Sequence, residues 1–583
     1  MSELLLQKIL HFPRSKTLGE WREKYLRDVN SRLMPGSCQM VPTGAFGKVN
    51  ICIMHFGWDL NHCNMHLAEL ARQLKENIES IPSGIFHGNI AAVPWISDGI
   101  ANGSPAMRAS LASRDFMTTD IVNHYIGTPY HGLILIPGCD KNMPAAAMSL
   151  LYANEPGWIL CGGSIRPGED NTDIVSVYQA SGKKDRGEIT EAEYAHVHEK
   201  ACPWAWACGG MYTANSMFTI FEAMGLTPLY GSSTMAEDKV KTGEIIDTAK
   251  LTEDIFLNHH TPSKYITKWS FENAVRILCV LGGSTNPVLH LLAMAQATKN
   301  WEHPIHFTEE DIEWISRATP FIANLAPNGS HRMQALAENG GTPTVLRYML
   351  EHGHLDGSQK TLTGKTLQEE LMKLDRWEYQ KNLATLFAQE ILKPFDIPYL
   401  DRGHLVYLQG NMGGGWTKVS NAGLEEFRGQ AVIFKNEQDF LANYQNRGIA
   451  AGSMVVIRNM GPKWGPGMPE MLTPTSKIIG AYGMQTRIWL MTDARFSGGS
   501  VGGAPIIGHM EENGNIRLIE NGDIIIIDPR KNLMELDISP DEIQTRISQY
   551  SPYKREEKHI PMPLRQYARG NPNPRAGSLS IEF

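Results

Sequence analysis

The feature that most constrains the fold is a change of pattern near residue 390. Up to about residue 385, short apolar runs of strand length alternate with helical patterns, as in the run 133–136, the helical stretch 143–153 and the run 158–160. Such alternation is typical of an α/β domain with a largely parallel sheet. We therefore predict an α/β domain over residues 1–390.

The second part of the chain has a different texture. A helical stretch from about 364 to 392 ends close to two prolines, Pro394 and Pro398, which mark a boundary. Short apolar runs separated by glycine-rich turns follow, at 431–434, 454–457, 488–491 and 524–527. This spacing predicts a β-rich, barrel-like domain over residues 391–583.

Three cysteines, Cys63, Cys139 and Cys208, each stand just ahead of a stretch that is predicted to begin a helix. A helix N-terminus carries partial positive charge and unpaired N–H groups, so it lowers the pKa of a thiol and stabilises thiolate ligands of a metal. Glycines beside Cys139 and Cys208 let backbone N–H groups approach the sulfur. The three loops can therefore converge on one cluster.

The other five cysteines lack the dense spacing of a disulfide scaffold, so reduced thiols in the cytoplasm are the better interpretation. Cys202, six residues before Cys208, is an alternative ligand only if it displaces one of the three. Four cysteines are expected to be small buried hydrophobic residues: Cys38, Cys52, Cys161 and Cys279.

Charge and hydropathy restrict the partners. The net charge of −8 and the isoelectric point near 6.2 give no basic surface for nucleic acid or an acidic membrane, so a small polar molecule is the expected partner. No apolar stretch reaches the length of a membrane span. The first 16 residues lack the pattern of a signal peptide, while an organellar transit segment stays open.

Two loops of the second domain carry chemical groups. Residues 461–476 are rich in proline and glycine and surround one carboxylate, Glu470; residues 493–500 follow an apolar run and present Ser497 on a tight turn. Loops at strand ends are where such folds place functional residues. A site between the two domains is the natural expectation.

Two other patterns are weak. His55, His62 and His66 lie near Cys63, but the paired spacing of a zinc site is missing. The run 364–366 has the letters that end a phosphate-binding loop, but the upstream glycine is one residue too far away and no strand precedes it. Neither is expected to bind a ligand of its own.

Seven segments make this chain resemble the dihydroxy-acid and phosphogluconate dehydratase family, in particular its dihydroxy-acid dehydratase branch. The segments occur in the family's order between residues 55 and 530. They are CNMHL (63–67), SDGI (97–100), IPGCDKNMP (136–144), CGGMYTAN (208–215), LGGSTN (281–286), GPGMPEM (465–471) and RFSGG (495–499).

The resemblance implies an iron–sulfur cluster, [2Fe-2S], held by Cys63, Cys139 and Cys208. Three thiolates leave one iron position open, and such an iron acts as a Lewis acid toward a departing hydroxyl. Family members are commonly homo-oligomers, so a homodimer or homotetramer is expected.

The resemblance also implies a Mg²⁺ site formed by Asp98, Asp140, Glu470 and a carbamylated Lys141, with Ser497 as the base. Oxygen ligands suit magnesium, and a carbamate turns a repelled cation into an anionic ligand. A free serine is too weak a base, so Ser497 depends on the neighbouring metals.

The implied reaction is dehydration of a 2,3-dihydroxy carboxylic acid to a 2-oxo acid, with branched-chain amino-acid biosynthesis as the default role. An alternative is the same chemistry on a sugar acid or an acid of specialised metabolism; a more remote one is a non-catalytic iron–sulfur protein. Departures from the family at the loop 409–418, at Ala494, and at Trp204 and Trp206 indicate a changed pocket. The loop 409–418 is expected to face the site.

Overall fold

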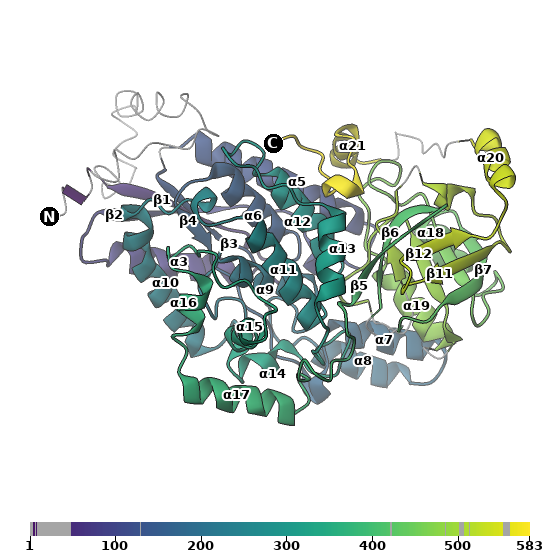
Figure 1. Ribbon diagram of the computed structural model, residues 1–583, viewed down its shortest axis with the longest axis horizontal. Helices are drawn as coiled ribbons and strands as arrows, with labels where there is room; N and C mark the ends of the chain where they lie inside the picture. The colour runs from purple at the N-terminus through teal and green to yellow at the C-terminus, as the bar shows by residue number, and fades with distance from the viewer. Residues whose placement is uncertain are drawn as a thin grey trace.

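The computed structural model describes residues 4, 5, 7, 48–128, 130–419, 423–483, 486–500, 506–511, 514–551 and 560–583. Cys38 and almost all of segment 1–16, with the predictions made for them, lie outside these residues. The described chain forms an α/β domain and a barrel domain side by side (Figure 1). The predicted fold class is confirmed.

The first domain contains a four-stranded parallel sheet in the order β2-β1-β3-β4. Its strands are β1 (Val49–His55), β2 (Phe86–Ala92), β3 (Gly132–Ile136) and β4 (Gly157–Ile159). Every residue of β3 and β4 is buried, as expected for a parallel sheet covered on both faces. The apolar runs 133–136 and 158–160 thus correspond to strands.

Helices make up most of the rest of this domain. They are α3 (Leu67–Glu79), α4 (Asp98–Ala101), α5 (Met107–Ile126), α6 (Asn142–Ala153), α7 (Ile174–Asp185), α8 (Glu191–Lys200), α9 (Thr213–Met224), α10 (Lys239–Leu257), α11 (Lys268–Leu281), α12 (Asn286–Gln296), α13 (Glu309–Ala318), α14 (Met333–Ala337), α15 (Gly341–Glu351), α16 (Leu367–Leu371) and α17 (Arg376–Ala388).

The predicted alternation of strands and helices up to residue 385 is wrong beyond β4, because the described residues from Ile174 to Ala388 form helices without a named strand. Buried helices explain the error. All residues of α12 except Gln296 are buried, and an apolar run of this kind cannot be told from a buried strand by periodicity. The helical stretch 364–392 is two helices, because Asp375 caps a new one by accepting a hydrogen bond from the Glu378 N–H at 2.8 Å.

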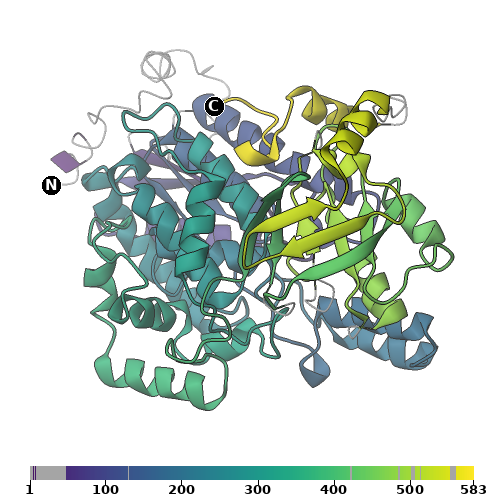
Figure 2. The same ribbon diagram turned by 45° about the vertical axis from the view of Figure 1, so that its right-hand side comes forward.

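The second domain is a closed barrel in the order β10-β6-β5-β12-β11-β7-β8-β9 (Figure 2). Its strands are β5 (Leu405–Gly410), β6 (Gly413–Lys418), β7 (Phe427–Phe434), β8 (Met454–Ile457), β9 (Trp489–Thr492), β10 (Ile506–Gly508), β11 (Ile524–Asp528) and β12 (Leu533–Leu536). Its helices are α18 (Glu437–Asn443), α19 (Leu472–Tyr482), α20 (Pro540–Gln549) and α21 (Met562–Arg569). All four predicted strands are present.

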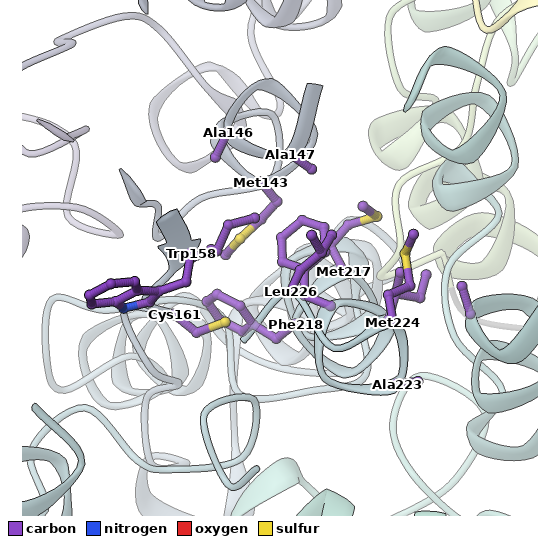
Figure 3. Packing of buried hydrophobic residues seen from close by; sticks show 14 of the residues in the cluster. Met143, Ala146, Ala147, Trp158, Cys161, Met217, Phe218, Ala223, Met224 and Leu226 are labelled. Atoms are coloured by element: carbon purple, nitrogen blue, oxygen red, sulfur yellow. The ribbon is translucent and has the colours of Figure 1, made fainter. Parts of the chain in front are cut away.

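The two helices that follow Cys139 and Cys208, α6 and α9, contact each other in the core. Met143 of α6 and Met217 and Phe218 of α9 are fully buried there (Figure 3). Helix α6 begins at Asn142, one residue before the helical stretch predicted from the sequence. This shared packing gives the cysteine loops a rigid base.

In the part of the chain that the structure describes, no helix is both long enough and apolar enough to cross a lipid bilayer.

Candidate active site

Three loops of the candidate site leave neighbouring strands of the parallel sheet. Cys63 follows β1, Asp98 follows β2, and the segment from Cys139 to Lys141 follows β3. Because parallel strands end at the same edge of a sheet, their carboxyl-terminal loops meet there, and open α/β sheets bind ligands at this edge. The topology thus brings most of the residues predicted for the site together.

The thiol of Cys63 lies between those of Cys139 and Cys208 and interacts with both. Gly99, next to Asp98, lies against these thiols, and its N–H donates a hydrogen bond to Cys139 Sγ at 3.2 Å. A Cβ atom at residue 99 would lie 2.6 Å from Cys63 Sγ and 3.3 Å from Cys139 Sγ. Only glycine fits this place, and its role was not predicted from the sequence.

The pKa of the Cys63 thiol indicates that this site favours a bound cation. Hydrogen bonds with Cys139 and Cys208, together with burial, hold the pKa of the Cys63 thiol well above its usual range. No described cysteine forms a disulfide. The hydrogen bond with Cys63 instead lowers the pKa of the Cys139 thiol. Metal ions that supply positive charge would stabilise such a group of neighbouring thiols as thiolates.

Three asparagines fix the cysteine loops. Asn64 donates from Nδ2 to Asn142 Oδ1 at 2.7 Å, and Asn142 Oδ1 also accepts from the backbone N–H of Cys139 at 3.1 Å. Asn215 donates from Nδ2 to the carbonyl oxygen of Cys208 at 2.6 Å. Each asparagine lies in a segment on which the family resemblance rests, but their positioning roles were not predicted.

A Gly99→Ala substitution tests the crowding around the thiols. We expect the methyl group to displace Cys63, at an overpacking cost of about 1–3 kcal/mol, and to lower the iron bound per chain after reconstitution. Gly243→Ala is the matched control, because residue 243 lies within α10 with nothing within 4 Å of an added Cβ. Normal iron content in Gly99→Ala would contradict the assigned geometry.

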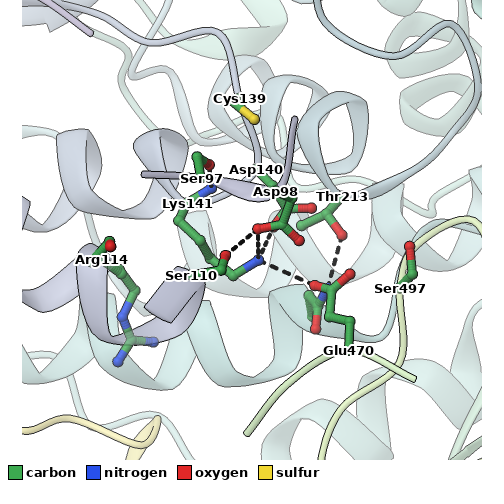
Figure 4. A network of polar contacts seen from close by, with 12 residues as sticks. Ser97, Asp98, Ser110, Arg114, Cys139, Asp140, Lys141, Thr213, Glu470 and Ser497 are labelled. Atoms are coloured by element: carbon green, nitrogen blue, oxygen red, sulfur yellow. Dashed lines mark hydrogen bonds and ion pairs between the residues drawn. The ribbon is translucent and has the colours of Figure 1, made fainter. Parts of the chain in front are cut away.

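The predicted magnesium ligands also come together. Asp98, Asp140 and Glu470 each offer an oxygen, and these three atoms lie within 4.8 Å of one another. Lys141 Nζ lies among them, 3.1 Å from Asp98 Oδ1, 3.1 Å from Glu470 Oε1 and in contact with Asp140 Oδ1 (Figure 4). Glu470 comes from the barrel domain, so the site lies between the two domains.

Two residues that were not predicted as functional hold Glu470 in place. Asn286, at the start of α12, donates from Nδ2 to Glu470 Oε1 at 2.5 Å, and Arg495 Nη1 donates to the same oxygen at 2.9 Å. Arg495 Nη1 also donates to Asn286 Oδ1 at 3.0 Å. This triangle spans the domain boundary and fixes the one ligand that the barrel provides.

Burial disfavours the ionised form of two of the three carboxyl groups, those of Asp140 and Glu470. Burial raises the pKa of Asp140 to about 7 and that of Glu470 to about 8. Oxygens Asp98 Oδ2 and Glu470 Oε2 are buried and have no hydrogen-bond partner among the described residues. Carboxylate oxygens without donors in a buried site fit a divalent cation such as Mg²⁺.

Ser497 lies on a turn after β9 that presses against the first domain. A Cβ atom at Gly498 would lie 2.5 Å from the backbone nitrogen of Thr213, and one at Gly499 would lie 2.6 Å from Val175 Cγ2. Ser497 Oγ accepts a hydrogen bond from the Gly499 N–H at 3.3 Å. The hydroxyl lies on the same side of the site as Glu470 and Thr213 (Figure 4).

The alternative ligands are not supported. Cys202 is exposed, and the thiols that interact with Cys63 are Cys139 and Cys208. His55 Nδ1 accepts the N–H of Gly57 at 3.1 Å, and His66 Nε2 lies 2.9 Å from the Gly162 carbonyl oxygen. Among the described residues, no histidine belongs to a set of three potential ligand atoms that lie within 4.8 Å of one another.

Of the segments that depart from the family pattern, one lies away from the candidate site and one lies beside it. The loop 409–418 that was expected to face the site is the β5–β6 hairpin, whose Asn411 bonds to Leu536 of β12. Trp416 is buried and donates from Nε1 to Glu309 Oε1 of α13 at 3.0 Å, so it packs between the domains. Trp206, in contrast, contacts the ring of His66 near Cys63, at 6.1 Å between centroids.

Comparisons with known proteins agree with this geometry. Residues 48–370 match the family described as dihydroxy-acid/6-phosphogluconate dehydratase N-terminal, and residues 390–574 match the corresponding C-terminal family. A dihydroxy-acid dehydratase of Lactococcus lactis subsp. cremoris is 38% identical over 517 residues, 87% of each chain. A chloroplastic dihydroxy-acid dehydratase of Arabidopsis thaliana is 40% identical over 86% of this chain and 81% of its own. A mitochondrial dihydroxy-acid dehydratase of Aspergillus fumigatus is 38% identical over 92% of this chain and 88% of its own.

Proposed function

This chain belongs to the dihydroxy-acid/6-phosphogluconate dehydratase family and is a hydro-lyase, and we propose that it converts a 2,3-dihydroxy carboxylic acid to a 2-oxo acid in branched-chain amino-acid biosynthesis. The observation that carries the proposal is the convergence of three thiols, three carboxylates and Ser497 where the two domains meet. The relatives at 38–40% identity have names that agree with this substrate class.

The proposal includes a [2Fe-2S] cluster on Cys63, Cys139 and Cys208, and Mg²⁺ on the carboxylates of Asp98, Asp140 and Glu470. The thiols suit the cluster because they are reduced and lie close to Gly99. The carboxylates suit Mg²⁺ because two of their oxygens have no hydrogen-bond donor among the described residues. When bound, the two groups supply Lewis acidity that favours loss of a hydroxyl and stabilises negative charge on the substrate.

Lys141 is proposed to become a carbamate. Burial lowers the pKa of the Lys141 amine, but the surrounding carboxylates outweigh burial and hold this pKa above its ordinary value. The free amine is therefore a cation in this site. Carbamylation requires the neutral amine. A divalent cation on the same carboxylates would repel the ammonium proton, so the modification and magnesium binding are expected to occur together.

The chain's own groups then act in a defined order. Asn286 and Arg495 keep Glu470 oriented, while the Gly498 contact holds the serine turn against Thr213. Ser497 Oγ, as the alkoxide, takes the proton from C2 of the substrate, and this proton leaves with the C3 hydroxyl as water. The resulting enol loses its hydroxyl proton and gains one at C3, which gives the 2-oxo acid. Preorganised groups of this kind lower the barrier without reorganisation during reaction.

Two further expectations belong to the proposal. A homodimer or homotetramer is proposed from family resemblance and would be measured by sedimentation. A cytoplasmic location is proposed from the reduced cysteines; the relatives named chloroplastic and mitochondrial make an organelle the competing outcome of a localisation experiment.

Turnover tests the proposal directly. Anaerobically purified protein with a reconstituted cluster and magnesium is expected to form a 2-oxo acid from 2,3-dihydroxyisovalerate and to leave a panel of sugar acids unchanged. The product is measured as its hydrazone. If a sugar acid reacts instead, the family chemistry holds and the branched-chain assignment is wrong.

Removal of magnesium is the control that separates an enzyme from a simple iron–sulfur protein. Chelation is expected to abolish turnover and to leave the visible spectrum of the cluster intact, because the carboxylates and the thiols form separate sites. Full turnover in the chelated protein would overturn the magnesium assignment.

A further inference from the structure

Trp206, two residues before Cys208, is a large aromatic side chain that the proposed mechanism does not use. Ala207 between them is extended, because it forms a β-bridge with Ser164 and its carbonyl oxygen accepts the Ile165 N–H at 2.8 Å. Side chains alternate along an extended segment, so Trp206 and Cys208 point to the same side of the chain. Trp206 is therefore placed on the side of the segment that carries the thiol.

A ring contact joins Trp206 to the loop of the first cysteine. The indole lies nearly perpendicular to the imidazole of His66, with 6.1 Å between the ring centroids. His66 stands three residues after Cys63, and the Cys63 thiol interacts with that of Cys208. The imidazole is held in turn by the backbone, because His66 Nε2 lies 2.9 Å from the Gly162 carbonyl oxygen. Trp206 thus lies against two of the three cysteine loops.

The three thiols differ in their exposure to solvent. Cys63 and Cys139 are only 2% and 3% exposed, whereas Cys208 is half-buried. Trp206 is half-buried as well, and Trp204, which is 59% exposed, lies against its ring with 5.8 Å between the centroids. The two indoles thus form an aromatic layer on the side where the thiol group reaches solvent.

We propose that Trp206, with Trp204 on its outer side, is an aromatic cover that limits the access of water and oxidants to the iron–sulfur cluster. This inference rests on the proposed function, because it needs a cluster on Cys63, Cys139 and Cys208. The apolar shell around a metal site controls solvent access, and through it the redox behaviour of the metal. An indole offers a donor N–H and no acceptor, so it excludes water beside Cys208 without becoming a ligand of iron itself.

Bleaching of the reconstituted protein by hydrogen peroxide tests the aromatic cover. Peroxide takes two electrons from a cluster sulfide and two protons from the medium and becomes two molecules of water; the sulfide is left as elemental sulfur, and the visible absorption disappears. Trp206→Ala is expected to raise the second-order rate constant of bleaching roughly tenfold, because it removes the ring beside Cys208. Trp206→Phe keeps a ring there and is expected to stay close to wild type. Equal rate constants in Trp206→Ala and wild type overturn the proposal.

Trp377→Ala is the matched control, because Trp377 is 71% exposed on α17 of the same domain and its ring contacts Lys381, so bleaching is expected to stay unchanged. A purely structural role of Trp206 makes a different prediction. Trp206→Ala would then lower the melting temperature and bleach at a rate set by unfolding, independent of peroxide concentration, and this result would also overturn the proposal. Cluster absorption is recorded before peroxide is added and turnover is not needed. A protein that takes up no cluster therefore contradicts the proposed function, whereas unchanged bleaching of an intact cluster contradicts the aromatic cover alone.

Discussion

A Cys139→Ser chain is expected to lose the visible absorption of the cluster and all dehydratase turnover. The hydroxyl of serine is a poorer ligand for iron than a thiolate, and the Cys139 sulfur lies beside Gly99, whose N–H donates to it at 3.2 Å. The loss should be complete, because a cluster held by three cysteines has no spare protein ligand. Iron content, the visible spectrum and 2-oxo acid formation measure it.

Cys202→Ser is the matched control for this result. Cys202 lies in the same segment of sequence as Cys208 but is exposed, so its substitution is expected to leave iron content and turnover unchanged. Near-ultraviolet circular dichroism would establish that Cys139→Ser keeps its fold. Retention of the cluster in Cys139→Ser together with its loss in Cys202→Ser would exchange the roles of the two cysteines.

The sequence predicts best where local pattern and topology coincide. The runs 133–136 and 158–160 are parallel strands, and loops after neighbouring parallel strands must meet at one edge. Cys63 and Cys139 are therefore brought together by the sheet itself, although 76 positions separate them in the sequence. The four apolar runs of the second domain are likewise strands of the barrel. The division at residue 390 stays a prediction.

The remaining features depend on contacts that local pattern does not encode. Helices such as α12 are buried on almost every side, so their apolar runs carry little amphipathic signal, and strands were expected to alternate with helices in this part of the chain. The hairpin 409–418 was assigned to the pocket because of a missing proline and an added tryptophan, but register with β12 and burial against α13 decide its place. Gly99 and Asn286 act through close approach and a cross-domain hydrogen bond, which only the folded chain reveals.

Ser497→Ala is expected to lower kcat by about a thousandfold while cluster absorption and magnesium binding stay unchanged. Proton abstraction by a positioned side chain contributes typically ~10²–10⁴-fold, and Ser497 lies on the same side of the site as Glu470 (Figure 4). Because the methyl group of alanine fits wherever the serine Cβ already lies, the turn against Thr213 and Val175 should persist. Steady-state kinetics with 2,3-dihydroxyisovalerate provide the measurement.

Ser500→Ala decides whether Ser497 or its neighbour on the same turn is the base. Ser500 is buried, and its Oγ has no hydrogen-bond partner among the described residues, so it is the competing hydroxyl. If Ser497 is the base, Ser500→Ala should keep kcat within about tenfold of wild type, since it removes no proton acceptor from C2. Affinity for the unreactive 2-hydroxyisovalerate should be unchanged in Ser497→Ala, because the loss lies in the chemical step. A large loss in Ser500→Ala with little effect in Ser497→Ala would transfer the role to Ser500 and leave the cluster and magnesium assignments intact.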